Sequence, residues 1–367
     1  MLEFIRVQRF KSLVDASFSL SGLNLFSGLN GMGKSSLVQT LLLLRQSFEK
    51  NALPNRGLLL KGDYVNLGTG RDILSEHADE ETFEFTLTRS DEEPQRFIFG
   101  YESASDLQPV KSAPVAIDTA GWSLFNTNFQ YLAADRVSPR SMYEASDYYI
   151  RDLKSLGNHG EYSVHYIAQY GSEPLPIPAL RHEKAVSLSL VENLDKWMSE
   201  ISPGIRIRAE LQTNVNSVSL GYVFEQGAEM TQVFKPQNVG FGLTFVLPVM
   251  VALLRSSPGD LLVIENPEAH LHPGAQAVLG RLCTIASSNG VQLFIETHSD
   301  HFLNGIRVSV KERLIAPSEV RLYYLERSSD RYHSVDIVSP EIDAEGRISF
   351  WPRGFFDEGD RQLEKLL

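Results

Sequence analysis

Residues 26–37 read FSGLNGMGKSSL and place three glycines and a lysine directly behind an apolar run. From Gly28 to Ser35 the chain matches the phosphate-loop pattern G-x-x-x-x-G-K-[ST] at every position. The sequence predicts a short strand at 23–26 and a helix at 36–44, which is the context that this motif requires. In such a loop, backbone N–H groups face a polyphosphate, Lys34 reaches the β- and γ-phosphates, and the Ser35 hydroxyl binds Mg²⁺. The alternative is a glycine-rich turn that caps a helix. The complete match favours a site for ATP or GTP.

Composition narrows the class of protein. The chain has 43% hydrophobic and 22% charged residues, which is ordinary for a globular protein. Its net charge of −12 argues against a protein whose whole surface binds nucleic acid. A local basic surface is still compatible with this charge. The single cysteine, Cys283, excludes an internal disulfide and favours an intracellular setting. The start MLEFIRVQRFKSL is strand-like and charged throughout, unlike a secretory signal, and the apolar stretch 242–254 is too short to span a bilayer. We expect a cytoplasmic protein with no membrane partner.

The hydrophobic patterning predicts an α/β protein in four parts. Residues 1–140 form the β-rich first half of the core, 141–202 a helical insertion, 203–338 the second half and 339–367 a tail. Within the insertion, Val186, Leu190, Leu194 and Trp197 recur at helix spacing. Strands and helices then alternate, with an apolar helix at 242–254, buried strands at 261–265 and 293–296, helices from Pro273 and Asp300, and closing strands at 320–325 and 333–338.

A phosphate loop needs a metal-binding carboxylate at the end of another buried strand. Residues 261–265, LLVIE, provide four apolar residues and then Glu265. The alternative is a core strand with a solvated acidic end. Two neighbouring segments favour the metal carboxylate: the strand LFIETHSD, which places His298 after it, and the turn NVGFG, with Gly240 and Gly242 before an apolar helix. Neither segment alone is specific for a nucleotide site. The order of the motifs along the chain is much more specific.

That order resembles the ABC-type ATPases of the RecF/SMC/OLD group, usually described as prokaryotic AAA family ATPases. The similarity covers about residues 1–50 and 235–310 and is poor in the middle. The segments VGFGLTFVLPVMVALL, VIENPEAHLHPGAQ and FIETHSDHFLNGIR are similar to the signature helix, the Walker B strand with its D-loop, and the switch-histidine segment. The tail WPRGFFD resembles a C-terminal domain of unknown function found on one branch of the group. The resemblance implies an ABC-type P-loop NTPase head with an N-terminal β-rich lobe, a helical/β middle insertion and a short C-terminal tail.

The resemblance also implies a role for each matching position. Glu265 would hold Mg²⁺, His298 would contact the γ-phosphate, and Arg136 would be a further polar contact. Gly240 and Gly242 would face the nucleotide of a second subunit in a head-to-tail homodimer or a higher oligomer. Residues 269–272 would be the D-loop at the same interface. Glu268, His270 and His272 imitate a metal site, but the D-loop explains them better. The phosphates would lie on the stretch from Gly28 to Ser36, which contains Asn30, Gly31, Gly33, Lys34, Ser35 and Ser36.

Three departures from the family pattern concern hydrolysis. The glutamate that usually follows the Walker B acid is replaced by Asn266, and an amide cannot accept a proton from water as a carboxylate does. Glu268 is the candidate substitute, although Pro267 stiffens the turn before it. The signature serine position is Gly240, which lacks a hydroxyl, and no glutamine loop is evident. We expect secure ATP binding and slow turnover.

Three functional interpretations stay open. The leading one is an ATP-gated dimeric switch for a separately encoded effector, a nuclease or a toxin, in bacterial anti-phage defence. The second is a DNA-repair ATPase that acts on DNA directly, with Arg206, Arg208, Arg307, Lys311 and Arg313 as candidate contacts. The third is a nucleotide-binding scaffold with negligible turnover. A GTPase switch is disfavoured, because its metal acid and base-reading motif should lie much closer to the phosphate loop.

Overall fold

The computed structural model describes the chain except residues 30, 91, 228, 330–331, 357 and 367. The chain divides into two compact units. The first consists of Met1–Asn126, Val320–Glu341 and Ile348–Leu367, and the second of Thr127–Glu319 and Ile342–Arg347. None of the helices in the described part of the chain has both the length and the apolar character needed to cross a bilayer.

The first unit contains an antiparallel sheet with the strand order β2-β1-β5-β6-β7-β4. Its fully buried phenylalanines, including Phe10, Phe83, Phe85 and Phe99, pack ring against ring with centroids 5.1–6.1 Å apart. Such aromatic clusters bury a large apolar area and explain why the alternating sequence is a sheet. The strands are β1 (Leu2–Phe10), β2 (Leu13–Ser19), β4 (Gly57–Leu59), β5 (Thr82–Arg89), β6 (Gln95–Gly100) and β7 (Leu107–Ser112).

A second group of strands in the first unit carries the phosphate loop. Strand β3 (Leu23–Gly28) pairs in parallel with β15 (Val320–Arg327), which pairs antiparallel with β16 (Val335–Val338). The predicted closing strand pair is therefore confirmed. Helix α1 (Lys34–Glu49) follows β3 after the loop, and α7 (Glu358–Leu366) lies in the tail.

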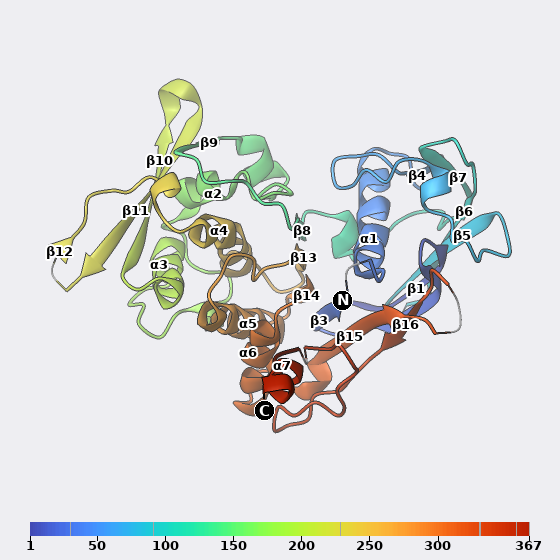
Figure 1. Cartoon of the computed structure of the whole chain (residues 1–367). Helices are drawn as coiled ribbons and strands as arrows, with labels where there is room; N and C mark the ends of the chain where they lie inside the picture. The colour runs from blue at the N-terminus through green and yellow to red at the C-terminus, as the bar shows by residue number, and fades with distance from the viewer. Residues whose placement is uncertain (30, 91, 228, 330–331, 357, 367) are drawn as a thin grey trace. The chain divides into compact units, whose positions relative to one another are not determined.

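Three parallel strands organise the second unit. Strand β13 (Leu261–Glu265) pairs with both β14 (Gln292–Glu296) and β8 (Phe129–Leu132). Helices α5 (Pro273–Ser288) and α6 (Asp300–Lys311) pack against each other, as Figure 1 shows in brown, and α4 (Phe241–Leu254) is buried along most of its length. The predicted strand ends and the starts of α5 and α6 are confirmed.

The middle of the chain is less helical than predicted. It contains α2 (Ser163–Tyr170) and α3 (Leu190–Ile201), together with the antiparallel strands β9 (Met142–Glu144), β10 (Ile205–Gln212), β11 (Ser217–Gln226) and β12 (Glu229–Met230). Val186 is 90% exposed and precedes α3, so its assignment to the helical face is wrong. Three prolines and one glycine between residues 171 and 178 interrupt the pattern. The proposed four-part division stays a prediction.

Short helical turns complete the secondary structure. They are Gly70–Asp72, Ser123–Phe125, Tyr148–Asp152, Pro178–Leu180, Thr213–Val215, Pro236–Asn238 and Pro317–Glu319.

Candidate nucleotide-binding site

The phosphate loop has the backbone conformation that its glycines allow. Gly31 and Gly33 have φ angles of 78° and 79°, in the left-handed region that favours glycine. Gly28 has φ 149°, and an added Cβ there would overlap the carbonyl oxygen of Leu325 on β15. Gly33 is the N-cap of α1, so the loop runs directly into a helix N-terminus. Unpaired N–H groups and the helix dipole make such an end suitable for an anion. Asn30 lies outside the described residues.

Lys34 and the two serines take different positions at the start of α1. The Lys34 side chain is buried, and its Nζ donates to the carbonyl oxygens of Gly28 and Leu29 at 2.9 and 3.0 Å. Ser35 is exposed, whereas Ser36 is buried with its N–H donating to Gly33 O. Hydrogen bonds from an ammonium group to ionised oxygens are stronger than those to neutral carbonyls, so a phosphate would compete well for Lys34. The loop therefore fits a phosphate group.

Glu265 lies at the carboxyl end of β13 in the second unit. Its Oε1 accepts a hydrogen bond of 3.1 Å from the Tyr131 hydroxyl on the neighbouring strand β8. Burial raises the pKa of Glu265, and the bond from Tyr131 opposes that shift. Sequence reasoning missed Tyr131, although it lies within the buried strand FQYL. A carboxylate held in this way at a strand end suits a hard cation such as Mg²⁺.

Arg136 supports the backbone beside Glu265. Its guanidinium is buried and donates to the carbonyl oxygen of Asn266 at 3.1 Å and to that of Glu265. Burial lowers the pKa of Arg136 to about 10. Both of these bonds go to main-chain oxygens, which makes Arg136 a positioning residue for the end of β13. The expected contact of Arg136 with the nucleotide stays a prediction.

Asn266 occupies a left-handed turn immediately after Glu265. Its φ is 42°, a conformation in which asparagine is enriched, and its N–H donates to Glu296 O at 2.8 Å. Its Oδ1 is buried and makes no hydrogen bond to any described residue. Strained backbone and unsatisfied polar atoms concentrate at functional sites, so this turn is a strong candidate for one.

Glu268 links the turn after β13 to His298. Its side chain is buried, and Oε1 accepts a hydrogen bond of 2.8 Å from the His298 backbone N–H. Burial raises the pKa of Glu268, and that hydrogen bond opposes the shift. The His298 residue is exposed, and α6 begins just after it, with the Ser299 side chain as its N-cap. The structure therefore brings Glu268 and the backbone of His298 together.

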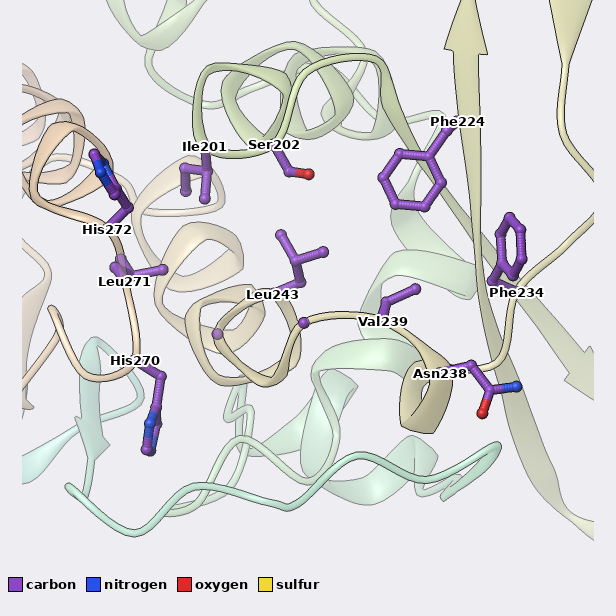
Figure 2. Close-up of a pocket in the computed structure, with 12 residues that line it drawn as sticks. Ile201, Ser202, Phe224, Phe234, Asn238, Val239, Leu243, His270, Leu271 and His272 are labelled. Carbon is purple, nitrogen blue, oxygen red and sulfur yellow. The ribbon is translucent and has the colours of Figure 1, made fainter.

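The glycine-rich turn lies against residues 269–272, the segment expected to be the D-loop. Gly240 is exposed at the N-cap of α4, and an added Cβ there would have no atom within 4 Å. At Gly242 an added Cβ would overlap the carbonyl oxygen of His270, which itself has φ 64°. Figure 2 shows the adjoining cavity of about 450 Å³, with the Leu243 side chain between the His270–His272 segment and the two phenylalanines of the opposite wall. The D-loop and the start of α4 are thus in direct main-chain contact.

This contact predicts opposite effects for two neighbouring glycines. Gly242→Ala should lower the free energy of unfolding by about 1–3 kcal/mol, because the new methyl group must displace the His270 backbone. Gly240→Ser should leave stability unchanged or raise it slightly, since the site is open and serine is a good N-cap. Urea denaturation of both variants measures the difference. Equal stabilities for the two would contradict the close approach.

The structure groups the predicted residues within each unit. The first unit holds Gly31, Gly33, Lys34, Ser35 and Ser36; the second holds Arg136, Glu265, Asn266, Glu268 and His298 around one strand end, and Gly240 with Gly242 at the D-loop. Over the described residues, no group of three or more histidine, cysteine and acidic side chains is arranged to hold a metal ion. Glu268, His270 and His272 therefore do not form such a group.

The fold is that of an SMC ATPase head. One similar solved structure is the "SmcHead bound to the C-winged helix domain of ScpA", with 15% identity, a TM-score of 0.57 and coverage of 93% of this chain and 98% of that one. Another is the "Smc head domain with an extended coiled coil bound to the C-terminal domain of ScpA derived from Pyrococcus furiosus", with 14% identity, a TM-score of 0.51 and coverage of 100% and 99%. The predicted α/β head fold is confirmed.

Residues 23–304 match the family described as "AAA domain, putative AbiEii toxin, Type IV TA system", and the chain belongs to this family. The expected kinship with ABC-type ATPases of the RecF/SMC-like group is thereby confirmed. Residues 315–366 match a second family, described as "Protein of unknown function (DUF3696)", and this range contains the whole WPRGFFD segment. No curated protein matches the chain.

Proposed function

We propose that this protein binds ATP with Mg²⁺, hydrolyses it slowly, and acts as a switch for a separately encoded effector. The observation that carries the proposal is the phosphate loop: a complete motif, folded with left-handed glycines and a buried lysine at a helix N-terminus. Membership of an AAA-domain family supports ATP as the nucleotide. Calorimetric titration with ATP and GTP, with and without Mg²⁺, tests it. Equal or tighter binding of GTP would contradict the choice of nucleotide.

Binding follows from what each side chain offers. The amides at the start of α1 and the Lys34 ammonium would hold the phosphates, with Lys34 exchanging two carbonyl partners for charged oxygens. The exposed Ser35 hydroxyl and the Glu265 carboxylate would hold Mg²⁺, which neutralises phosphate charge when bound. Tyr131 and Arg136 would keep Glu265 in place through its carboxylate and its backbone. The exposed His298 would orient toward the γ-phosphate, with its backbone fixed by Glu268.

The proposed switch includes an ATP-dependent homodimer. Because Gly240 is exposed and its surroundings are open, it is available to a partner's nucleotide at the N-terminus of α4. We expect a non-hydrolysable ATP analogue with Mg²⁺ to convert monomers to dimers, or to tighten an existing dimer, in multi-angle light scattering. Gly240→Arg should keep the fold and weaken this dimer, whereas Gly240→Ser should not. A monomer in every state at high concentration would exclude the switch as proposed.

The effector, anti-phage defence and a cytoplasmic location belong to the same proposal and rest on the resemblance. Co-purification of the protein with the product of a neighbouring nuclease or toxin gene, in the presence and absence of ATP, tests the first. Phage challenge of cells that carry the gene pair, with wild-type protein or the Lys34→Ala variant, tests the second. Identical survival of the two strains would contradict a defence role.

The two other functions differ in their support. A scaffold with negligible turnover is favoured by Asn266 and Gly240, which replace a base and a hydroxyl. The partners of two candidate cations, Arg206 and Arg307, argue against direct DNA binding. Arg206 pairs with Glu225 at 2.6 Å and Asp195 at 3.5 Å, and Arg307 donates to Gly346 O at 2.8 Å. A gel-shift titration at several salt concentrations distinguishes a DNA-binding protein.

A further inference from the structure

A cavity of about 430 Å³ lies at the opposite end of β13 from Glu265. It opens where β8 and β13 begin, near Phe129 and Leu262, and all of its lining residues belong to the second unit. Its ionisable lining residues are Arg151, Lys154, Tyr166, Tyr170, Arg255 and Asp260. None of its lining residues belongs to the phosphate loop or to the group around Glu265.

Arg255 forms the polar wall of this cavity. Its Nη1 donates to Lys154 O and its Nη2 to Gln130 Oε1, both at 2.9 Å, and its guanidinium lies 5.5 Å from the centre of the Tyr166 ring. Both acceptors are neutral, and Nε is buried without a hydrogen bond to any described residue. A desolvated charge normally acquires an opposite charge or a full set of acceptors. Among the residues that the structure describes, Arg255 therefore has no anionic partner in direct contact.

The remaining charges do not supply that partner. Asp260 is the one carboxylate among the lining residues, and its Oδ2 accepts a 2.9 Å hydrogen bond from the Ser257 N–H. In the described structure Asp260 forms no ion pair with Arg255 within 4 Å. Burial lowers the pKa of Arg255, and the charge of Asp260 opposes that shift from a longer distance. Arg151 has a loose exposed pair with Asp147 at 3.7 Å, and Lys154 is exposed. Three cations thus face one carboxylate around a space that can admit a ligand.

Another part of the wall is apolar and aromatic, beside the polar residues Thr127, Asn128, Gln130 and Ser257. Tyr166 and Tyr170 have ring centroids 4.8 Å apart, and Phe129, Ile150 and Pro176 also line the space. The volume falls in the range of sites for small organic ligands. A bare phosphate ion would contact the cations and leave the aromatic wall uncovered. A ligand with a phosphate at one end and a planar ring at the other matches both walls.

We propose that this cavity binds a mononucleotide-sized organic phosphate, separately from the phosphate loop. Arg255, Arg151 and Lys154 contact the phosphate, and the tyrosines contact the ring. The site goes beyond the proposed ATPase function and does not depend on it, because none of its residues belongs to the phosphate loop.

The test uses the full-length Lys34→Ala variant, which removes the phosphate-loop lysine. Calorimetric titration compares AMP, adenosine and inorganic phosphate as probes. We expect AMP to bind at one site per chain, and adenosine and phosphate to bind at least about tenfold more weakly, as expected when charge-assisted bonds or ring contacts are lost. Absence of AMP binding, or phosphate binding as tight as that of AMP, would overturn the proposal.

Substitutions in the same background locate the site. Arg255→Met should remove AMP binding, and the double variant Arg151→Gln/Lys154→Gln should weaken it at least about tenfold. Arg255 also donates a hydrogen bond to the Lys154 backbone, so Arg255→Met could misfold. The double variant changes two exposed residues and tests the site in that case. Arg208→Gln, an exposed arginine on β10, is the matched control and should leave affinity unchanged. AMP affinity that is the same in the double variant as in this control would refute the assignment.

Discussion

Replacing Lys34 with alanine should lower the affinity for ATP by at least about 100-fold. The Lys34 ammonium is buried at the start of α1, and its two carbonyl partners belong to the phosphate loop itself. Loss of two charge-assisted hydrogen bonds to phosphate, at about 1.5–3 kcal/mol each, is sufficient for a reduction of this size. Isothermal titration calorimetry with Mg²⁺ and a non-hydrolysable analogue measures the change.

The control for Lys34 must remove one positive charge from the same unit. Lys61 is suitable, because it is half exposed and makes a surface ion pair with Asp106 at 3.6 Å. Lys61→Ala should bind ATP as the wild type does, since an exposed pair of this kind contributes little. Circular dichroism should show that both variants are folded. If folded Lys34→Ala keeps the wild-type affinity, the phosphate-loop interpretation is wrong.

Hydrolysis should be slow, below about 1 s⁻¹, which is the low edge of typical enzyme rates. A well-placed general base contributes about 10²–10⁴-fold, and the position that normally provides it is Asn266. If Glu268 acts instead, Glu268→Gln should reduce the residual rate by a factor in that range and leave ATP affinity nearly intact. Glutamine keeps an oxygen that can accept the His298 N–H, so the substitution tests proton acceptance more than position.

Two comparisons make the turnover experiment decisive. Glu268→Ala removes the acceptor for the His298 N–H as well, so a rate loss that occurs only in the alanine variant would identify Glu268 as a positioning residue. Asn266→Glu restores a carboxylate but places it at φ 42°, where a side chain other than asparagine or glycine costs about 1–2 kcal/mol. We expect a faster but less stable enzyme. Fast wild-type turnover that survives Glu268→Gln would contradict both parts of the argument.

Local sequence predicted those parts of the site that local geometry controls. The glycines at 31 and 33, the strand that ends at Glu265, and the helices that begin at Pro273 and Asp300 follow from patterns within a few residues. Burial of the strands and the turn chemistry of glycine are sufficient to specify them.

The supporting contacts could not be predicted in the same way. Tyr131 contacts Glu265 across the pairing of β8 with β13, and the two residues are 134 positions apart in the sequence. Arg136 and Glu268 act through hydrogen bonds to main-chain atoms. Every residue has these atoms, so such bonds leave no recognisable pattern in the sequence. The helix content of the middle region is lower than its apolar spacing predicts. The spacing continues through the proline-rich loop before α3, where no long helix forms.

The parallel pairing of β3 with β15 has a consequence for how the protein is made. Gly28, at the end of β3, lies against Leu325 of β15, almost 300 residues later in the chain. At a ribosomal rate of about 5–20 residues per second, β15 is synthesised roughly 15–60 s after β3. During that interval the nascent chain carries the phosphate-loop sequence without the strand that supports it. If the loop needs this support to bind ATP, ribosome-bound chains halted before residue 320 should not be retained on ATP-agarose, whereas released full-length protein should be.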